Sequence, residues 1–131
     1  MMEHPEFVAW DRSSPFLDAI GGFRRHLNDP LRIGFTVDGA KVNGRGFLHT
    51  GTIAAIADVA IGHTLAEMTD PPSRLVTVNL SCDLLGSAQA GDWVDVLVTP
   101  TRVGRRLAAG TATFRTSRPI AMVTGLFMPQ S

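Results

Sequence analysis

The chain has 131 residues, a mass of 14.1 kDa and a formal net charge of zero. Its composition, with 44% hydrophobic and 18% charged residues, excludes disordered, collagen-like and low-complexity proteins. A chain of this length can bury a core without a covalent staple, and its single cysteine, Cys82, excludes an internal disulfide and a cysteine-based zinc site.

The first 30 residues predict a helical extension in front of the main domain. The basic start and the apolar run that are typical of a secretory leader are both missing, so we expect no secretory leader. Ser14 and Pro15 are typical of a helix start. Apolar residues then recur every three or four positions, at Phe16, Ile20, Phe23 and Leu27. Asn-Asp-Pro at 28–30 ends this helix, so we divide the chain into an extension, 1–30, and a main domain, 31–131.

The main domain predicts one long helix and five strands. Residues 31–38 alternate between apolar and polar side chains, which indicates a strand. The segment from Thr50 to Met68 is apolar on nearly every side, so we expect a helix buried all round, with strands wrapped about it. Four strand patterns follow, at 74–85, 92–103, 105–116 and 119–128. Consecutive hairpins with a helix on one face are an α+β layout.

The first of these four strands has a regular alternation that predicts its two faces. One face carries Val76, Val78, Leu80, Cys82 and Leu84. The other carries Thr77, Asn79, Ser81 and Asp83. Because side chains alternate across a strand, we expect the first set, Cys82 included, to pack into the core.

Charge and hydropathy also limit the class of partner. The longest apolar stretch, 53–66, is interrupted by Asp58 and His63 and is too short to span a bilayer. No basic run resembles a nucleic-acid patch. We therefore expect a cytoplasmic protein that binds neither membranes nor nucleic acids.

Asp58 is the residue that folding alone does not explain. It is the only acid between Gly39 and Ala66, and it lies in the middle of the apolar helix. Its neighbours at four-residue spacing, Ala54 and Gly62, are small and leave space beside it. Burial of an unpartnered carboxylate is costly, which favours a role as general base or nucleophile. The alternative is a helix face that reaches water or an arginine across an interface.

A second group of polar residues precedes the long helix. His49 and Thr50 fall where the helix begins, so the unpaired N–H groups of its first turn point outward. Such a helix end favours negative charge, including the oxyanion that forms when a carbonyl is attacked. Asn43 and His49 supply side-chain donors nearby. The alternative is that His49 is only a helix cap or a surface residue.

Other kinds of site find no support in the sequence. The four histidines, at 4, 26, 49 and 63, lack the spacing of a metal site, so we expect no metal. No serine lies in a nucleophile elbow, and the glycines at 44 and 46 are not continued as a dinucleotide-binding motif. We expect no metal or redox cofactor.

The pattern Asn43-x-x-Gly46-x-x-His49-x-Gly51, followed by Asp58 seven residues later, resembles the PaaI-like branch of the hotdog-fold acyl-CoA thioesterases. Residues 75–80 and 103–106 are similar to that family's later strands. The resemblance covers roughly residues 31–130. It implies an α+β hotdog fold, in which a curved antiparallel sheet wraps around a long central helix. It also implies a homodimer or homotetramer whose active site lies across the subunit interface.

The resemblance further implies a role for each site residue. Asp58 of one subunit would activate water or attack the thioester carbonyl, while Asn43 and His49 of the other would place the thioester. The backbone N–H of Thr50 or Gly51 would hold the oxyanion. Thr77 would position the water. The coenzyme A phosphates would contact the turn formed by Arg102, Gly104, Arg105 and Arg106.

One residue departs from the family pattern, and two other functions stay open. The family usually has His-Gly-Gly where this chain has His49-Thr50-Gly51, so a branched side chain stands where glycine permits close approach. The leading prediction is hydrolysis of a small or aromatic acyl-CoA. A non-catalytic acyl-CoA-binding or regulatory protein is the main alternative. A hydratase is the other, because Asp58 and His63 are five positions apart, although the Asn-Pro that accompanies this spacing in hydratases is missing.

Overall fold

The apolar segment predicted as a long helix forms α2 (Thr50–Met68) with the predicted boundaries. The structure is a computed structural model that describes residues 4–130. Two short helical segments precede α2, namely α1 (Pro15–Ala19) and the 3-10 turn η1 (Gly39–Lys41). The strands are β1 (Phe7–Ala9), β2 (Arg24–His26), β3 (Arg32–Thr36), β4 (Leu75–Leu84), β5 (Trp93–Val103), β6 (Ala108–Arg115) and β7 (Pro119–Pro129).

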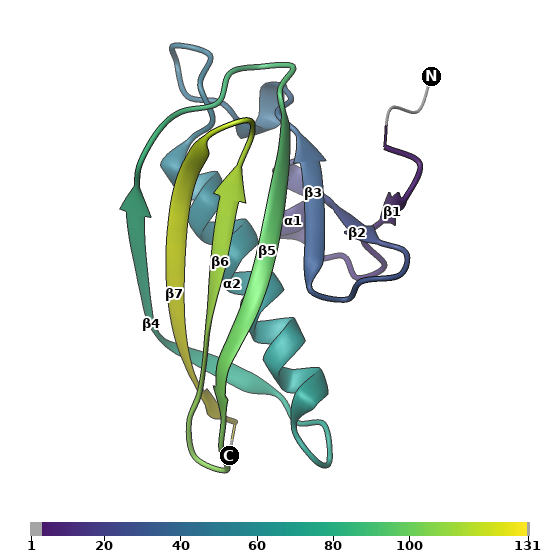
Figure 1. Cartoon of the computed structure of the whole chain (residues 1–131), viewed down its shortest axis with the longest axis vertical. Coiled ribbons are helices and arrows are strands. Elements are labelled where there is room, and N and C mark those ends of the chain that lie inside the picture. The colour runs from purple at the N-terminus through teal and green to yellow at the C-terminus, as the bar shows by residue number, and fades with distance from the viewer. Residues whose placement is uncertain (1–3, 131) are drawn as a thin grey trace.

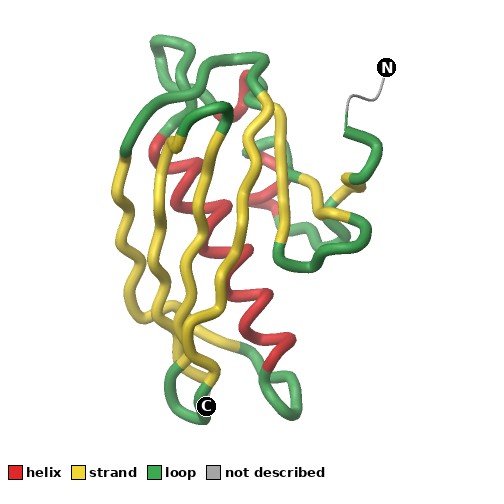
Figure 2. Tube along the Cα trace, in the orientation of Figure 1, coloured by secondary structure: helices red, strands yellow, loops and turns green. Residues whose placement is uncertain are grey.

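All seven strands form one antiparallel sheet in the order β1-β2-β3-β5-β6-β7-β4, and α2 lies along one face of it (Figure 1). Figure 2 shows the same two layers, with the sheet curving past the helix. The predicted α+β hotdog architecture is therefore confirmed. Among the described residues, no helix is long and apolar enough to cross a membrane.

The core lies between α2 and the inner face of the sheet. The helix contributes buried side chains that include Ile53, Ile56, Ile61 and Leu65. The sheet contributes Val94, Val96, Val98, Ala112, Phe114, Val123 and Phe127. The prediction that α2 is buried all round is wrong for the single chain, because Asp58, Val59, Gly62 and His63 are only half-buried. One side of the helix contacts the sheet, and the other stays accessible.

Strand β4 forms one edge of the sheet, and a β-bulge changes the direction of its side chains. The register against β7 shifts between Thr77 and Asn79, which leaves Val78 without a partner. Thr77 stands opposite the buried Phe127 and therefore faces α2, as Leu80 does beyond the bulge. The strict alternation predicted for 74–85 is thus wrong at its start. The extra residue brings Thr77 to the inner face.

The N-terminal helix is much shorter than predicted. Helix α1 ends at Ala19, and Gly21 and Gly22 follow with φ of 87° and 72°, a conformation that ends a helix. The chain then forms β2, which pairs with β1 and β3. The 3.6-residue spacing of Phe16, Ile20, Phe23 and Leu27 therefore does not mark one continuous helix, and of these side chains Phe23 is buried whereas Phe16 and Leu27 are exposed. Part of the predicted extension belongs to the sheet.

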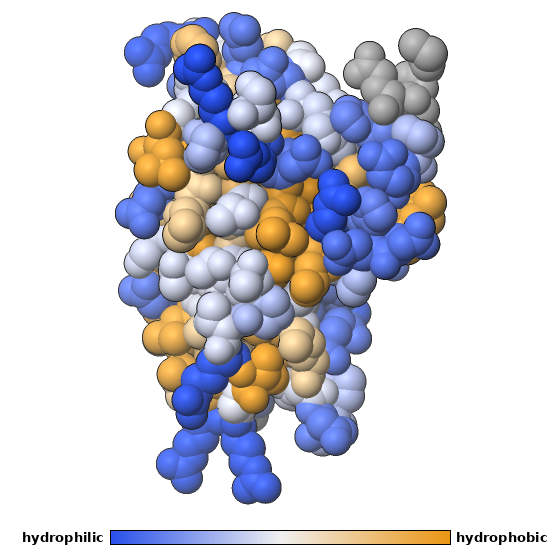
Figure 3. All heavy atoms as spheres, in the orientation of Figure 1, coloured by the Kyte–Doolittle hydropathy of each residue, from blue (hydrophilic) through white to orange (hydrophobic). Residues whose placement is uncertain are grey.

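The outer face of the sheet carries apolar side chains among polar ones, as Figure 3 shows. Val76, Leu97, Met122 and Met128 are exposed on β4, β5 and β7. The strand predicted from residue 105 begins at Ala108, because the N–H of Gly104 donates to the carbonyl of Leu107 (2.9 Å) and closes a turn. The other predicted strands are confirmed with ends shifted by one or two residues.

Candidate active site

Asp58 projects from the middle of α2 toward β4. The hydroxyl of Thr77 donates to Oδ1 of Asp58 at 2.5 Å, a distance typical of a hydrogen bond to a charged oxygen. The bulge in β4 makes this contact possible because it turns Thr77 to the inner face. The carboxylate is thus held by one oxygen while the other can accept a further hydrogen bond.

His49 caps α2 and is fixed at two points. Its ring Nδ1 accepts a hydrogen bond from the backbone N–H of Gly51 (2.8 Å), and the backbone N–H of His49 donates to the carbonyl of Lys41 (2.8 Å). Because Nδ1 is an acceptor, the neutral ring carries its proton on Nε2, on the side away from the helix. His49 is a helix cap, as the alternative interpretation proposed, and it also presents a donor to the surface.

The first turn of α2 offers one unused backbone donor. The N–H of Gly51 is engaged by His49, and the N–H groups of Thr52 and Ile53 both donate to the carbonyl of His49. Within residues 4–130, the N–H of Thr50 meets no acceptor. Of the two predicted oxyanion donors, Thr50 is therefore the one left available.

Asn43 shapes the loop in front of the helix. Its Oδ1 accepts from the N–H groups of Arg45 (2.9 Å) and Phe47 (3.2 Å), and its backbone N–H donates to the carbonyl of Phe47 (2.7 Å). This is an Asx-type turn, in which the side chain replaces a backbone acceptor. The side-chain amide nitrogen stays available as a donor because only the oxygen is used in the turn.

The two halves of the candidate site do not meet within one chain. Thr50 and Asp58 are eight residues apart on α2, which is about 12 Å along the helix axis. A carbonyl at hydrogen-bond distance from the Thr50 N–H is therefore out of reach of Asp58 in the same chain. Asp58 and Thr77 form one half of the site, and Asn43, His49 and Thr50 form the other.

The arginine turn lies at the opposite end of α2 from His49. Arg102, Arg105 and Arg106 are exposed at the turn between β5 and β6. A cavity of about 420 Å³ lies there, between the end of α2 at Met68 and the turn at Gly104. The structure therefore groups these arginines with one another and not with Asp58.

Lys41 supports the site, and the sequence analysis did not identify it. Its side chain is 1% exposed, and its ammonium forms an ion pair with Asp38 at 3.1 Å. Its carbonyl accepts from His49 N–H and from the hydroxyl of Thr52, so it anchors the start of α2. The available signal was that Lys41 is the only lysine in the chain and follows an aspartate by three residues.

His63 and Cys82 are both perturbed by burial. Burial, reinforced by the Arg12 guanidinium, lowers the pKa of His63, which packs edge-on against Trp10. Burial and the nearby Asp83 raise the pKa of the Cys82 thiol. His63 is therefore neutral near pH 7, and its ring contacts Trp10. In the part of the chain that the structure describes, no three His, Cys, Asp or Glu side chains gather as metal ligands.

Comparison with known structures gives the same fold at low sequence identity. The zebrafish thioesterase superfamily member 2 has a TM-score of 0.80 and 18% identity, covering 90% of this chain and 89% of that one. The PaaI protein of the E. coli phenylacetic acid degradation operon has a TM-score of 0.76 and 16% identity, covering 91% and 86%. Smu.793 of Streptococcus mutans, solved with acetyl CoA, has a TM-score of 0.70 and 20% identity, covering 76% and 80%.

Comparison with sequences identifies the family. PA0474 of Pseudomonas aeruginosa, a protein named as a candidate esterase, is 35% identical over 131 residues, which cover 97% of this chain and 98% of that protein. The model of the thioesterase superfamily matches residues 45–120, a range that contains His49, Asp58 and Thr77. This chain therefore belongs to the thioesterase superfamily.

Proposed function

We propose that this protein hydrolyses a small or aromatic acyl-CoA thioester to the free acid and coenzyme A, with Asp58 as general base or nucleophile. The observation that carries the proposal is the carboxylate of Asp58 in the middle of an apolar helix, held by the Thr77 hydroxyl at 2.5 Å. Membership of the thioesterase superfamily supports the reaction class. A similar fold solved with acetyl CoA supports the substrate class.

The proposal includes a dimer, because one chain holds only separate halves of the site. Strand β4 is an edge strand with exposed Val76, Val78 and Leu84, and an unpaired apolar edge favours pairing with a second copy. Two copies related by a two-fold axis contribute the same surface to each other. In such a dimer, Asp58 of each chain acts on a carbonyl held by the partner subunit's Thr50 N–H. A tetramer would use a further surface, such as the exposed outer face of the sheet.

In the proposed reaction, Asp58 takes a proton from water as the water oxygen bonds to the thioester carbonyl carbon. The carbonyl becomes an oxyanion, which the N–H of Thr50 stabilises. The C–S bond then breaks and the thiolate of coenzyme A leaves, taking up the proton that Asp58 had accepted. In the covalent variant, the Asp58 carboxylate attacks the carbonyl carbon, the C–S bond breaks and the coenzyme A thiolate leaves. Water then hydrolyses the resulting anhydride to the free acid and the Asp58 carboxylate, and its remaining proton goes to the thiolate. Thr77 keeps the carboxylate oriented in both routes, and its oxygen can still accept a hydrogen bond from the water that it is predicted to position.

Neighbouring groups have supporting roles in the proposal. Asn43 and His49 donate from Nδ2 and Nε2 to the bound thioester. The exposed Arg102, Arg105 and Arg106 bind the phosphates of coenzyme A, since a guanidinium matches phosphate geometry. Gly104 permits the turn that gathers these arginines, and no cofactor takes part.

The test is release of thiol from a panel of acetyl-, hexanoyl-, palmitoyl-, benzoyl- and phenylacetyl-CoA. We expect at least one substrate to turn over, and Asp58→Asn to lower the rate by at least about 10²-fold. Asp18→Asn is the matched control, because it removes an exposed carboxylate on α1. An Asp58→Asn rate within threefold of the wild-type rate would exclude Asp58 as the base. Binding of acyl-CoA without turnover of any panel member would favour the acyl-CoA-binding alternative.

A further inference from the structure

A cavity of about 310 Å³ begins one helical turn from Asp58. Gly62 lines it and follows Asp58 by four residues, so both lie on the same side of α2 about 6 Å apart along the axis. Leu75 also lines it and precedes Thr77 by two residues on the same face of β4. The cavity is therefore continuous with the side of the helix that carries the candidate carboxylate.

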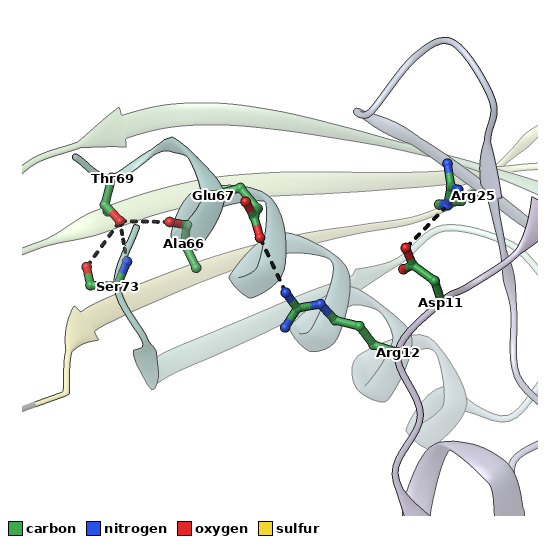
Figure 4. Close-up of polar contacts among 7 residues, drawn as sticks. All are labelled: Asp11, Arg12, Arg25, Ala66, Glu67, Thr69 and Ser73. Carbon is green, nitrogen blue, oxygen red and sulfur yellow. Dashed lines mark hydrogen bonds and ion pairs between the residues drawn. The ribbon is translucent and has the colours of Figure 1, made fainter. Parts of the chain in front are cut away.

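The far wall of this cavity comes from the N-terminal segment. Trp10 lines it, and its ring packs against Phe23 at 4.8 Å and edge-on against His63 at 5.0 Å, measured between ring centroids. Arg12 forms an ion pair with Glu67 at 3.4 Å, which ties this segment to α2 (Figure 4). Trp10 is thus held from two sides, and the segment that carries it is attached to the helix.

The lining of the cavity combines apolar and small side chains with four polar ones. The apolar or small lining residues are Trp10, Leu17, Val59, Gly62, Ala66 and Leu75, and the polar ones are Arg12, His63, Arg74 and Gln130. His63 is neutral near pH 7 because burial lowers its pKa. A volume of about 310 Å³ lies at the lower end of the range for small-molecule pockets, which suits a compact apolar group.

We propose that this cavity receives the acyl group of the thioester and that Trp10, supplied by the N-terminal segment, limits the length of that group. The inference rests on the proposed function, because it places the carbonyl at Asp58 and the acyl chain along Gly62 and Ala66. It specifies the substrate class as short or compact apolar acyl groups. It also gives the N-terminal segment a role as a specificity element.

The experiment measures affinity for S-ethyl-, S-hexyl- and S-decyl-CoA, thioethers that cannot be hydrolysed, by titration calorimetry on the full chain. Trp10→Ala opens the far wall, so we expect decyl binding to gain at least about tenfold relative to hexyl. Ala66→Leu fills the cavity, so we expect hexyl binding to weaken at least about tenfold while ethyl binding is kept. Phe16→Ala is the control, because Phe16 is exposed beside Leu17 and does not line the cavity.

The outcomes separate this inference from the proposed function. A chain-length profile of Ala66→Leu equal to that of the wild type overturns the inference, even if Trp10→Ala fails to fold. Absence of thioether binding overturns it as well. Shifted profiles without turnover of any thioester support the acyl cavity and contradict the proposed hydrolysis. Turnover that depends on Asp58, together with unchanged chain-length profiles, supports the proposed hydrolysis and overturns the acyl cavity.

Discussion

Asp58 and Thr77 form a hydrogen-bonded polar pair between the otherwise apolar helix α2 and strand β4. The hydroxyl of Thr77 has a single hydrogen to donate, and it gives this hydrogen to Asp58. A hydrogen bond to a charged group contributes about 1.5–3 kcal/mol, more than one between neutral groups. Loss of the Thr77 hydroxyl should therefore change the orientation of the carboxylate while the backbone stays in place.

We predict that Thr77→Val lowers turnover by about tenfold or more, and that Thr77→Ser keeps it close to the wild-type rate. Valine has the shape of threonine without the hydroxyl, whereas serine keeps the donor. The measurement is kcat on the best substrate of the panel, with thermal unfolding as the check on folding. Equal kcat values for the valine and serine variants would show that the hydrogen bond has no part in the reaction.

At the scale of elements, the short turn η1 is linked to the start of α2 through Lys41. Asp38 caps η1 by accepting from the N–H of Ala40 (3.1 Å) and also pairs with the buried ammonium of Lys41. The carbonyl of Lys41 in turn accepts from His49 N–H, at the helix start. An ion pair of which one member is fully buried is sensitive to which partner is removed.

We therefore predict that Asp38→Asn destabilises the protein by about 1–3 kcal/mol, whereas Lys41→Met costs less, because the Asp38 side chain is 48% exposed and water can solvate it when its partner is gone. The first change leaves a buried cation without its counter-ion, while the second replaces the ion by an apolar chain of similar volume. Urea unfolding of the two variants measures both free energies. The prediction fails if Lys41→Met costs as much as Asp38→Asn.

The β4 bulge and the Gly21-Gly22 turn are the elements that the sequence patterns misplaced. Both features depend on a neighbouring strand. The register of β4 against β7 shifts between Thr77 and Asn79. After the glycine turn, β2 pairs with β1 and β3. A periodic pattern describes a segment alone and contains no information about its partner. These errors are therefore local, and α2 and the other main strands were predicted well.

At the scale of the whole molecule, the proposed function requires a second copy of the chain. Asp58 and Thr50 lie about two turns apart on one helix, so no conformational change within α2 can bring them together. The edge strand β4 and the outer face of the sheet are two separate surfaces that a partner could cover. One substitution on each surface can show which of the two surfaces forms the proposed dimer.

We predict that Val78→Lys, on the edge strand where Val78 is 51% exposed, produces monomers and abolishes turnover. A charge on an edge strand opposes strand pairing. Met122→Lys, on the outer sheet face, should keep the dimer and its activity while preventing any tetramer. Sedimentation equilibrium gives the masses and thiol release gives the activity. A Val78→Lys dimer with full turnover would contradict the proposed interface.

The sequence by itself determined the long helix, the main strands and the α+β layout, and its resemblance to a known family supplied the hotdog fold and several of the residues proposed for the site. Local periodicity specifies elements, and an acid in an apolar helix is conspicuous without any structure. Only the tertiary structure decided that Thr77 faces Asp58, that Gly51 is occupied by His49, and that Lys41 anchors the helix start. Those facts depend on register and on contacts between distant segments, which a one-dimensional pattern does not contain.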